Sequence, residues 1–366
     1  MEKLLNKLGK RNLIIAGVVG IILLILIIIL SVYMVSISPV NKKNQAEIKV
    51  TIPLGSGASK IAEVLKENKI IRSETAFKIY VKLNKISDFQ AGTYYLKQSM
   101  NLKEITDMLK TGIMHDPNQI SLTYVEGKNI RWLASKISEI TNNTEEDVYN
   151  VLNDEQYINS LIEQYWFLTD DIKNENIYYS LEGYLFPDTY MIENKDTEIE
   201  KIFEKMLDRT ENILEEYKDE IENSKYSIHE ILTIASIIEM ESMSDEGRKD
   251  VSSVIYNRLE MDMPIQSDVT TYYAFRVDMG ERDLYQKEID SYNPYNTRGP
   301  KMEGKLPIGP ISSVSKNSIE AALNPSSTEY IFFVADKNGK LYFSKTDEQH
   351  NQIINKLKNQ GLWFEY

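Results

Sequence analysis

The chain has 366 residues, a formal net charge of −13 and no cysteine. Without cysteine it can form neither disulfides nor sulfur-ligated metal sites, and thiolate catalysis is excluded. Three histidines leave little material for a zinc site or a serine–histidine triad, and an acidic chain repels nucleic acid. We therefore expect no metal, no other cofactor and no nucleic acid partner. The length suggests two or more domains.

The first predicted element is a membrane helix. Residues 13–35 contain no charge and are mostly Ile, Leu and Val, and a helix of this length spans a hydrocarbon core of roughly 30 Å. Residues 1–12 contain four basic residues and one acidic residue, which favours a cytoplasmic N-terminus and a translocated remainder. A cleaved signal peptide is the alternative, but its apolar region usually has about 7–15 residues and ends at a small-residue site, which is missing here. A polar linker at 36–47 follows.

A small module is expected at 48–113. The alternation of Ile48, Val50 and Ile52 predicts a half-buried strand. Two short amphipathic helices follow, and residues 91–96 read as a returning strand. Asn101 and Glu104 form a capping pair for a last helix. The predicted order is therefore β-α-α-β-α.

Part of this module recurs farther along the chain. At an offset of 72, five residues of the first copy match five of the second: Thr51, Gly55, Ile61, Ala62 and Leu65 with Thr123, Gly127, Leu133, Ala134 and Ile137. Residues 91–94 have a looser match at 182–185, an offset of 91. The pattern indicates a diverged second copy, although an accidental match of small and apolar residues is the alternative.

Residues 198–259 have helical periodicity. Ser227 and Glu230 form a capping box that begins a helix ending near Met243, and Gly247 is expected to precede the next helix. After Pro264 the chain is rich in turn signals.

Near the C-terminus, residues 330–334 and 340–343 flank an Asn-Gly turn and predict a β-hairpin. The fold class expected for residues 114–366 is a mixed α+β domain.

Glu239 is the candidate catalytic residue, because it lies on a helix that is apolar nearly all round. Burial disfavours the charged form of a carboxyl, and a carboxyl that keeps its proton can act as a general acid on a glycosidic oxygen. Ala235 and Ser236, one turn earlier, would leave room for a ligand. Glu241 points about 200° away, at about 100° per residue. The alternative is that Glu239 forms a buried ion pair with Arg248 or Arg258.

The motifs around this helix resemble the YceG-like endolytic murein (peptidoglycan) transglycosylases over nearly the whole chain. The matching segments are residues 182–190, 232–241, 254–259, 266–270, 291–297, 306–312, 321–325 and 343–346, with His350 and Asn351. The resemblance implies that Glu239 is the catalytic acid and that residues 48–113 form a LysM-like domain before a catalytic domain at 114–366.

The sequence departs from the family pattern in a few loops. Lys305 replaces a usual Gly, Ile308 stands where a second Pro is often found, and Val269 replaces a frequent Pro. Residues 313–315 read Ser-Val-Ser where Asn-Pro-Gly is common. These changes affect the expected shape of the loops at 305–315. We expect them to leave the helix with Glu239 untouched.

Several polar residues in the matching motifs are candidates for substrate binding, since short polar side chains on loops suit sugar hydroxyls and acetamido groups. These candidates are Glu182, Asn257, Arg258, Gln266, Ser267, Asp268, Asn293 and Asn296. For Asn257 and Arg258, pairing on a helix surface is an equal alternative. Glu182 and Asp268 are also the acids that the fold could bring to Glu239.

The resemblance implies a lytic transglycosylase that cuts the β-1,4 bond between N-acetylmuramic acid (MurNAc) and N-acetylglucosamine (GlcNAc) inside nascent glycan strands. It leaves 1,6-anhydro ends and terminates elongation, with one Glu as acid and then base. The implied location is the outer face of the cytoplasmic membrane, with peptidoglycan synthases (penicillin-binding proteins) as partners. Two alternatives remain: a non-catalytic wall-binding scaffold and a hydrolytic muramidase.

Overall fold

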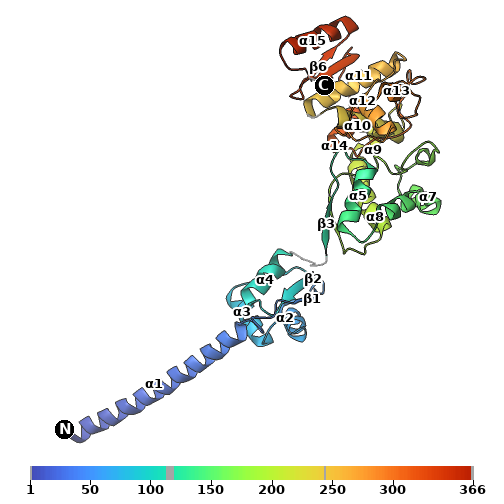
Figure 1. Ribbon diagram of the computed structural model, residues 1–366. Helices are drawn as coiled ribbons and strands as arrows, with labels where there is room; N and C mark the ends of the chain where they lie inside the picture. The colour runs from blue at the N-terminus through green and yellow to red at the C-terminus, as the bar shows by residue number, and fades with distance from the viewer. Residues whose placement is uncertain (1, 113–118, 243–244, 364–366) are drawn as a thin grey trace. The chain divides into compact units, whose positions relative to one another are not determined.

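The computed structural model describes residues 2–112, 119–242 and 245–363, and the chain divides into two compact units at residues 119 and 120. Figure 1 shows both units, which are described separately here. The predicted boundary between residues 113 and 114 lies outside the described residues. Helices and short two-stranded sheets alternate in both units, so the expected mixed α+β class is confirmed.

The N-terminal helix α1 extends from Glu2 to Ile37. Within it, residues 18–37 are strongly apolar, with a mean hydropathy of 3.2, and their most apolar stretch is not buried against the rest of the described chain. A helix of this length and composition fits a single-pass membrane anchor. The segment that follows is held against the rest of the first unit, because the Arg72 guanidinium donates to the carbonyl oxygens of Pro39 and Val40 at 2.7–3.0 Å.

The rest of the first unit has the predicted β-α-α-β-α order. Its elements are β1 (Glu47–Ile52), α2 (Ala58–Glu67), α3 (Glu74–Leu83), β2 (Gly92–Lys97) and α4 (Leu102–Thr111). β1 and β2 pair antiparallel with Thr51 opposite Thr93. The capping box of Asn101 and Glu104 is present. The apolar faces of the strands and helices enclose a small core of their own.

The second unit begins with a copy of the same strand pair. Its first elements are β3 (Ile120–Thr123), α5 (Ile130–Ile140), α6 (Glu145–Leu152), α7 (Glu155–Gln164), η1 (Asp170–Lys173) and β4 (Thr189–Ile192). Thr123 lies opposite Thr189, and their hydroxyls are 3.0 Å apart, as those of Thr51 and Thr93 are 3.1 Å apart. The hydroxyls of Tyr94 and Tyr190 each donate to a carbonyl four residues earlier.

This pairing supports the predicted duplication and corrects one of its offsets. The first strands differ by 72 residues, as expected, but the second strands differ by 189 − 93 = 96 residues. The predicted match of 91–94 with 182–185 was therefore wrong by five positions. The error arose because Gly183 resembles Gly92 in sequence, whereas residues 182–185 form a turn before β4.

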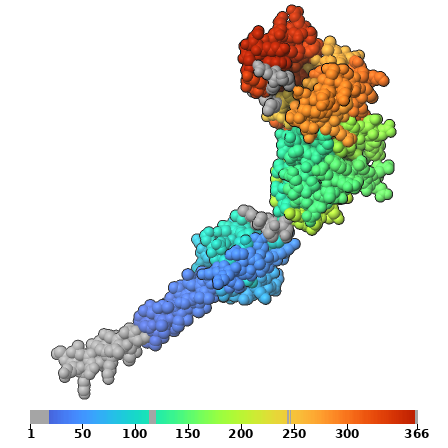
Figure 2. All heavy atoms as spheres, in the orientation of Figure 1, coloured from blue at the N-terminus to red at the C-terminus, as the bar shows by residue number. Residues whose placement is uncertain are grey.

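The helical part of the second unit is built around α10. Its elements are α8 (Ile199–Leu214), η2 (Glu215–Tyr217), α9 (Lys218–Glu222), α10 (Ile228–Glu241), α11 (Asp245–Glu260), α12 (Asp268–Ala274), α13 (Gln286–Ile289) and α14 (Lys316–Leu323). The predicted capping box of Ser227 and Glu230 begins α10, and α11, α12 and α14 pack against it. The predicted end near Met243 lies outside the described residues. Figure 2 shows the orange part of these residues, which contains α12 and α13, next to the green segment that contains α5 to α7.

Gly247 lies inside α11 and does not precede it, so that expectation was wrong. A Cβ at residue 247 would lie 2.5 Å from Cδ1 of Leu341. Close packing of the hairpin on α11 therefore explains a glycine within a helix.

The predicted C-terminal hairpin is present. β5 (Phe332–Ala335) and β6 (Leu341–Ser344) pair antiparallel, and α15 (Asp347–Asn359) packs on them. The strands are joined by five residues, 336–340, with Gly339 at a φ of 81°.

Candidate active site

Glu239 lies near the C-terminal end of α10. Ten of the fourteen residues of this helix are buried, and the Glu239 side chain is only 5% exposed. Burial follows from the sequence, because the helix is apolar on every face and has neighbours on several sides. The loop before α14 lies along it: Ile311 N–H donates to the Ser236 hydroxyl at 3.1 Å, and the Ser312 hydroxyl donates to the Ser236 carbonyl at 3.3 Å.

Three donors hold the two carboxylate oxygens of Glu239. Arg248 on α11 donates through Nη2 to Oε1 at 3.1 Å. Ser315 donates to Oε2 twice, through its backbone N–H at 2.9 Å and its hydroxyl at 2.5 Å. Arg248 also pairs with Asp245, and its Nε has no partner among the described residues. The ion pair between Arg248 and Glu239, the alternative to a catalytic role, is thus present, and it fixes the orientation of the carboxylate.

Ser315 was not expected to contact Glu239. It is the N-cap of α14, where its hydroxyl accepts from Ser318 N–H at 3.3 Å. It also replaces the Gly that is common at this position. The helix with Glu239 forms as expected despite the departures at 305–315, but the loop folds back and places this hydroxyl on Glu239. Loop contacts of this kind have no periodic signal in the sequence.

Replacing Ser315 by Ala is expected to lower kcat/KM about tenfold, because a hydrogen bond to a charged group is lost while the backbone donor stays. The matched control is Ser312→Ala, which removes a hydroxyl from the same loop that bonds only the Ser236 carbonyl. Steady-state kinetics on isolated glycan strands measures both. Equal losses in the two variants would show that the Ser315 hydroxyl has no special role.

A second carboxyl, Glu126, lies near Glu239. The loop of residues 125–128 is tied to Ser313 by three hydrogen bonds of 2.8–3.2 Å, and a Cβ on Gly127 would lie 3.9 Å from Cγ of Glu239. Burial raises the pKa of the Glu126 carboxyl, and the charge of Glu239 raises it further, while Arg248 opposes this. The repeat match that includes Thr123 and Gly127 was the one hint of this loop that could be read before the structure.

A cavity of about 160 Å³ is lined by Gly127 and Met240, the chain neighbours of Glu126 and Glu239, while the two carboxyl groups are not part of its wall. Gly127 lies close to the Glu239 side chain, and Met240 follows Glu239 in the chain. The remaining wall comes from the start of α5, from α12 and from the loop after α12: Lys128, Asn129, Arg131, Trp132, Val269, Tyr272, Tyr273, Val277, Asp278, Met279 and Ile311.

The predicted substrate-binding residues 266–268 gather around Glu241, on a different side of α10. The Ser267 hydroxyl donates to Glu241 Oε1 at 2.5 Å, and the exposed Asp268 pairs with Arg298. Burial raises the pKa of Glu241, and the charge of Asp268 adds to this. The exposed Gln266 accepts from Arg258 Nη1 at 3.3 Å. The acid that the fold brings to Glu239 is therefore Glu126 and not Asp268.

The other candidates have internal partners. Asn257 donates to the Thr328 and Tyr330 carbonyls, and Arg258 donates to the carbonyls of Pro264, Ile265 and Ile331, so both hold the segments around them in place. 

Asn293 donates to the Tyr178 hydroxyl at 2.8 Å. Asn296 is fully buried and donates to three backbone carbonyls between residues 288 and 291. Within residues 2–112, 119–242 and 245–363, no group of three or more potential metal ligands occurs.

Glu182 is buried in the second unit, and its carboxyl is held by internal hydrogen bonds. Both its oxygens accept from Ile130 N–H at 3.1–3.2 Å, so it caps α5, and Oε2 also accepts from the Tyr273 hydroxyl at 2.9 Å. Burial raises the pKa of Glu182 to about 8, although these hydrogen bonds and Arg131 act against the rise. The carboxyl is thus mostly neutral at pH 7.

Glu182→Gln is expected to remove a pH dependence of stability. Between the unfolded pKa near 4.5 and the folded pKa of about 8, the folded state binds more protons, so the wild-type free energy of unfolding falls as the pH rises. The slope is on the order of 1 kcal/mol per pH unit. Calorimetric Tm values of the full chain in detergent should therefore fall more from pH 5 to pH 8 in the wild type than in the variant. Parallel curves would contradict a neutral buried Glu182.

Comparisons with known proteins agree with the motifs. The sequence model of the YceG-like family matches residues 50–356. The endolytic murein transglycosylase of Bacillus subtilis is 40% identical over 321 residues, which cover 87% of each protein. A protein of the same name from Streptococcus pneumoniae is 31% identical over 343 residues, which cover 89% of this chain and 61% of that protein. The crystal structure of a yceG-like protein from Listeria monocytogenes matches with a TM-score of 0.60 and 36% identity, covering 84% of this chain and 99% of that one.

Proposed function

Because the chain belongs to the YceG-like family, we propose that it is an endolytic peptidoglycan lytic transglycosylase. Its substrate is the nascent glycan strand, and the bond cut is the β-1,4 bond between MurNAc and GlcNAc. The observation that carries the proposal is Glu239, a nearly buried carboxylate held by three donors and adjacent to Gly127 and Met240 of a cavity wall. Relatives named endolytic murein transglycosylase support the same reaction class.

The proposed reaction uses Glu239 twice. The protonated carboxyl first donates to the glycosidic oxygen as the bond from MurNAc C1 to that oxygen breaks. The resulting carboxylate accepts the proton of the C6 hydroxyl of the same MurNAc, whose oxygen forms the new bond to C1. The products are a 1,6-anhydro end and a free hydroxyl on GlcNAc, and Glu239 regains its starting proton. No water is consumed.

Arg248 and Ser315 suit the carboxylate that exists between the two proton transfers. Their hydrogen bonds are charge-assisted and hold the group in one orientation. The carboxylate therefore needs no reorganisation before it acts as a base. The same contacts restrain Glu239 in the free enzyme, so the substrate has to bind where the carboxyl already points.

A hydrolytic muramidase is the second candidate, and Glu126 is the observation that favours it. Ordinary glycosidases use two carboxyl groups, one as acid and one as base or nucleophile. Glu126 is near enough for the charge of Glu239 to raise its pKa. In that mechanism Glu126 would activate water, and the new end would be a reducing sugar.

The proposal also covers the role of the first unit and the location of the protein. We propose that residues 48–113 are a LysM-like domain that binds glycan, which the β-α-α-β-α order supports. The basic residues at 1–12 favour a cytoplasmic N-terminus, which puts the catalytic unit on the outer face of the membrane. There it meets strands as synthases make them, and internal cuts would terminate elongation.

The test is digestion of purified peptidoglycan by the full chain in detergent, followed by mass spectrometry of the soluble fragments. The proposal expects fragments of many lengths, because the cuts are internal, each with an anhydro end that is one water lighter than a reducing end. Reducing ends alone would favour the muramidase. No release of fragments would leave the wall-binding scaffold as the better description.

A further inference from the structure

The cavity lined by Gly127 and Met240 has two cationic residues in its wall, on an acidic protein. Lys128 and Arg131 both line it, although the chain has a net charge of −13. Lys128 is exposed and forms no ion pair within the described residues. Two cations at one cavity create a local field that attracts anions against the global charge.

Arg131 does not stabilise the helix on which it lies. It is the second residue of α5, and a cation in the first turn of a helix is opposed by the helix dipole. It does lower the pKa of Glu182, but that carboxyl keeps a pKa of about 8 and is mostly neutral at pH 7. The guanidinium charge therefore remains available to a ligand.

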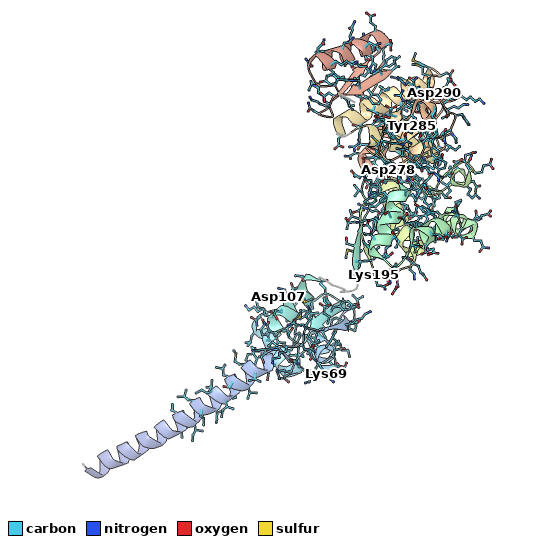
Figure 3. The ribbon with its side chains drawn as sticks, in the orientation of Figure 1. Lys69, Asp107, Lys195, Asp278, Tyr285 and Asp290 are labelled. Atoms are coloured by element: carbon cyan, nitrogen blue, oxygen red, sulfur yellow. The ribbon has the colours of Figure 1, made fainter. Side chains whose placement is uncertain are left out.

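The present partner of Arg131 is easily displaced. Nη2 of Arg131 and Oδ1 of Asp278 are 2.6 Å apart, and the Asp278 side chain is 74% exposed. Figure 3 labels Asp278, which lies in the second unit beside the α5 segment. Exposed ion pairs contribute little free energy. A ligand carboxylate that reached Arg131 could replace Asp278 at small cost.

The rest of the cavity wall is mixed: Asn129, Asp278 and two tyrosines line it together with apolar side chains. Trp132 is half-buried and stacks on Tyr124 with ring centroids 6.2 Å apart, and Val277 and the exposed Met279 come from the loop after α12. The cavity thus combines two cations with a wall that is partly apolar. It suits a group that has a carboxylate beside short apolar parts, such as a free lactyl carboxylate or, where a peptide is attached, a carboxylate of that peptide beside its lactyl and alanyl groups.

We propose that this cavity binds the lactyl–peptide substituent of the MurNAc residue at the cut bond, with Arg131 and Lys128 on its carboxylates. This inference rests on the proposed function. The cavity is placed for it, because Gly127 and Met240 belong both to its wall and to the surroundings of Glu239. Arg131 and Lys128 then select strands that contain MurNAc over an uncharged GlcNAc polymer. Asp278 acts as an internal competitor for Arg131.

The test compares two changes with opposite expected effects. Arg131→Gln should raise KM for MurNAc-containing strands about tenfold with kcat little changed, and Asp278→Asn should lower KM because the competitor is gone. The control pair is Arg209→Gln and Asp188→Asn, an ion pair of 2.9 Å that lies away from the cavity. Both controls should keep the wild-type KM. A fall in kcat without a change in KM, or equal effects in the control pair, would overturn the inference.

A binding measurement separates this inference from the proposed function. The probe is a soluble muramyl dipeptide, titrated into the full chain in detergent by calorimetry, with N-acetylglucosamine as the uncharged comparison. The inference expects Arg131→Gln to weaken the muramyl dipeptide about tenfold and to leave the uncharged sugar unaffected. Equal Kd values for wild type and variant would refute it even if the enzyme cuts peptidoglycan. A wild type that binds the dipeptide but cuts nothing would instead refute the proposed function.

Discussion

Glu239→Gln is expected to reduce kcat/KM on glycan strands by at least about a thousandfold, because a positioned acid and base contributes roughly 10²–10⁴ and this residue has both roles. Gln has nearly the same shape and keeps one acceptor oxygen for the Ser315 donors. Its amide cannot transfer the proton. The measurement is steady-state cleavage of isolated strands by the full chain in detergent.

Glu241→Gln is the matched control, since it makes the same change two residues along the same helix. The Glu241 carboxyl bonds Ser267 and not the groups around Glu239. This variant should keep most of the wild-type activity. Thermal unfolding of both variants checks the fold, because Glu239→Gln leaves Arg248 with Asp245 as its charged partner. Residual activity within tenfold of wild type in Glu239→Gln would remove Glu239 from the mechanism.

Gly183→Ala is expected to cause the largest loss of stability. Gly183 has a φ of 78°, and a Cβ there would lie 2.3 Å from Cβ and 2.7 Å from Cγ of Pro310. The proline ring is rigid and cannot move aside as a long side chain could. The backbone strain and the clash together should cost more than about 3 kcal/mol, the range of the most damaging substitutions. The Tm of a domain of this size would fall by roughly 10 °C.

Gly280→Ala separates the two causes. Gly280 has a φ of 88° in the same unit, but a Cβ there would meet nothing within 4 Å. Its cost should be the backbone strain alone, about 1 kcal/mol. Calorimetry of both variants tests this difference. If the two substitutions lowered Tm equally, close packing of the turn at Gly183 against the loop that holds Ser315 would not be needed for stability.

The sequence predicted the features that depend on local signals. Apolar composition predicted a helix at 13–35, and capping residues predicted where the helices at Asn101 and Ser227 begin. The apolar faces around Glu239 predicted its burial. Each of these signals lies within a few residues of the structure that it specifies, so one chain is enough to read it.

The immediate surroundings of Glu239 could not be predicted in the same way. Ser315 is 76 residues after it, and Glu126 is 239 − 126 = 113 residues before it. Both lie on loops, whose paths are set by tertiary hydrogen bonds such as those between Ser313 and the 125–128 loop. Similarly, Glu182 looked like a loop acid available to a ligand, but the fold buries it as the cap of α5.

The repeat shows how far a weak pattern can be used. Equal spacing at Thr51 and Thr123 predicted a second copy, and the paired threonines of both sheets support it. Between its strands the second copy has one more α-helix than the first, α7, and the short helix η1, so a fixed offset fails there. The register of a strand is set by its partner and not by distance along the chain.

The central claim is that Glu239 alone moves both protons and that the sugar's own C6 hydroxyl attacks C1. Digestion of peptidoglycan in heavy-oxygen water tests it most directly, with mass spectrometry of the newly formed ends. The account predicts anhydro ends that contain no heavy oxygen, and no cleavage by Glu239→Gln. Reducing ends that contain one heavy oxygen, lost on Glu126→Gln, would contradict it and assign the second carboxyl to the activation of water.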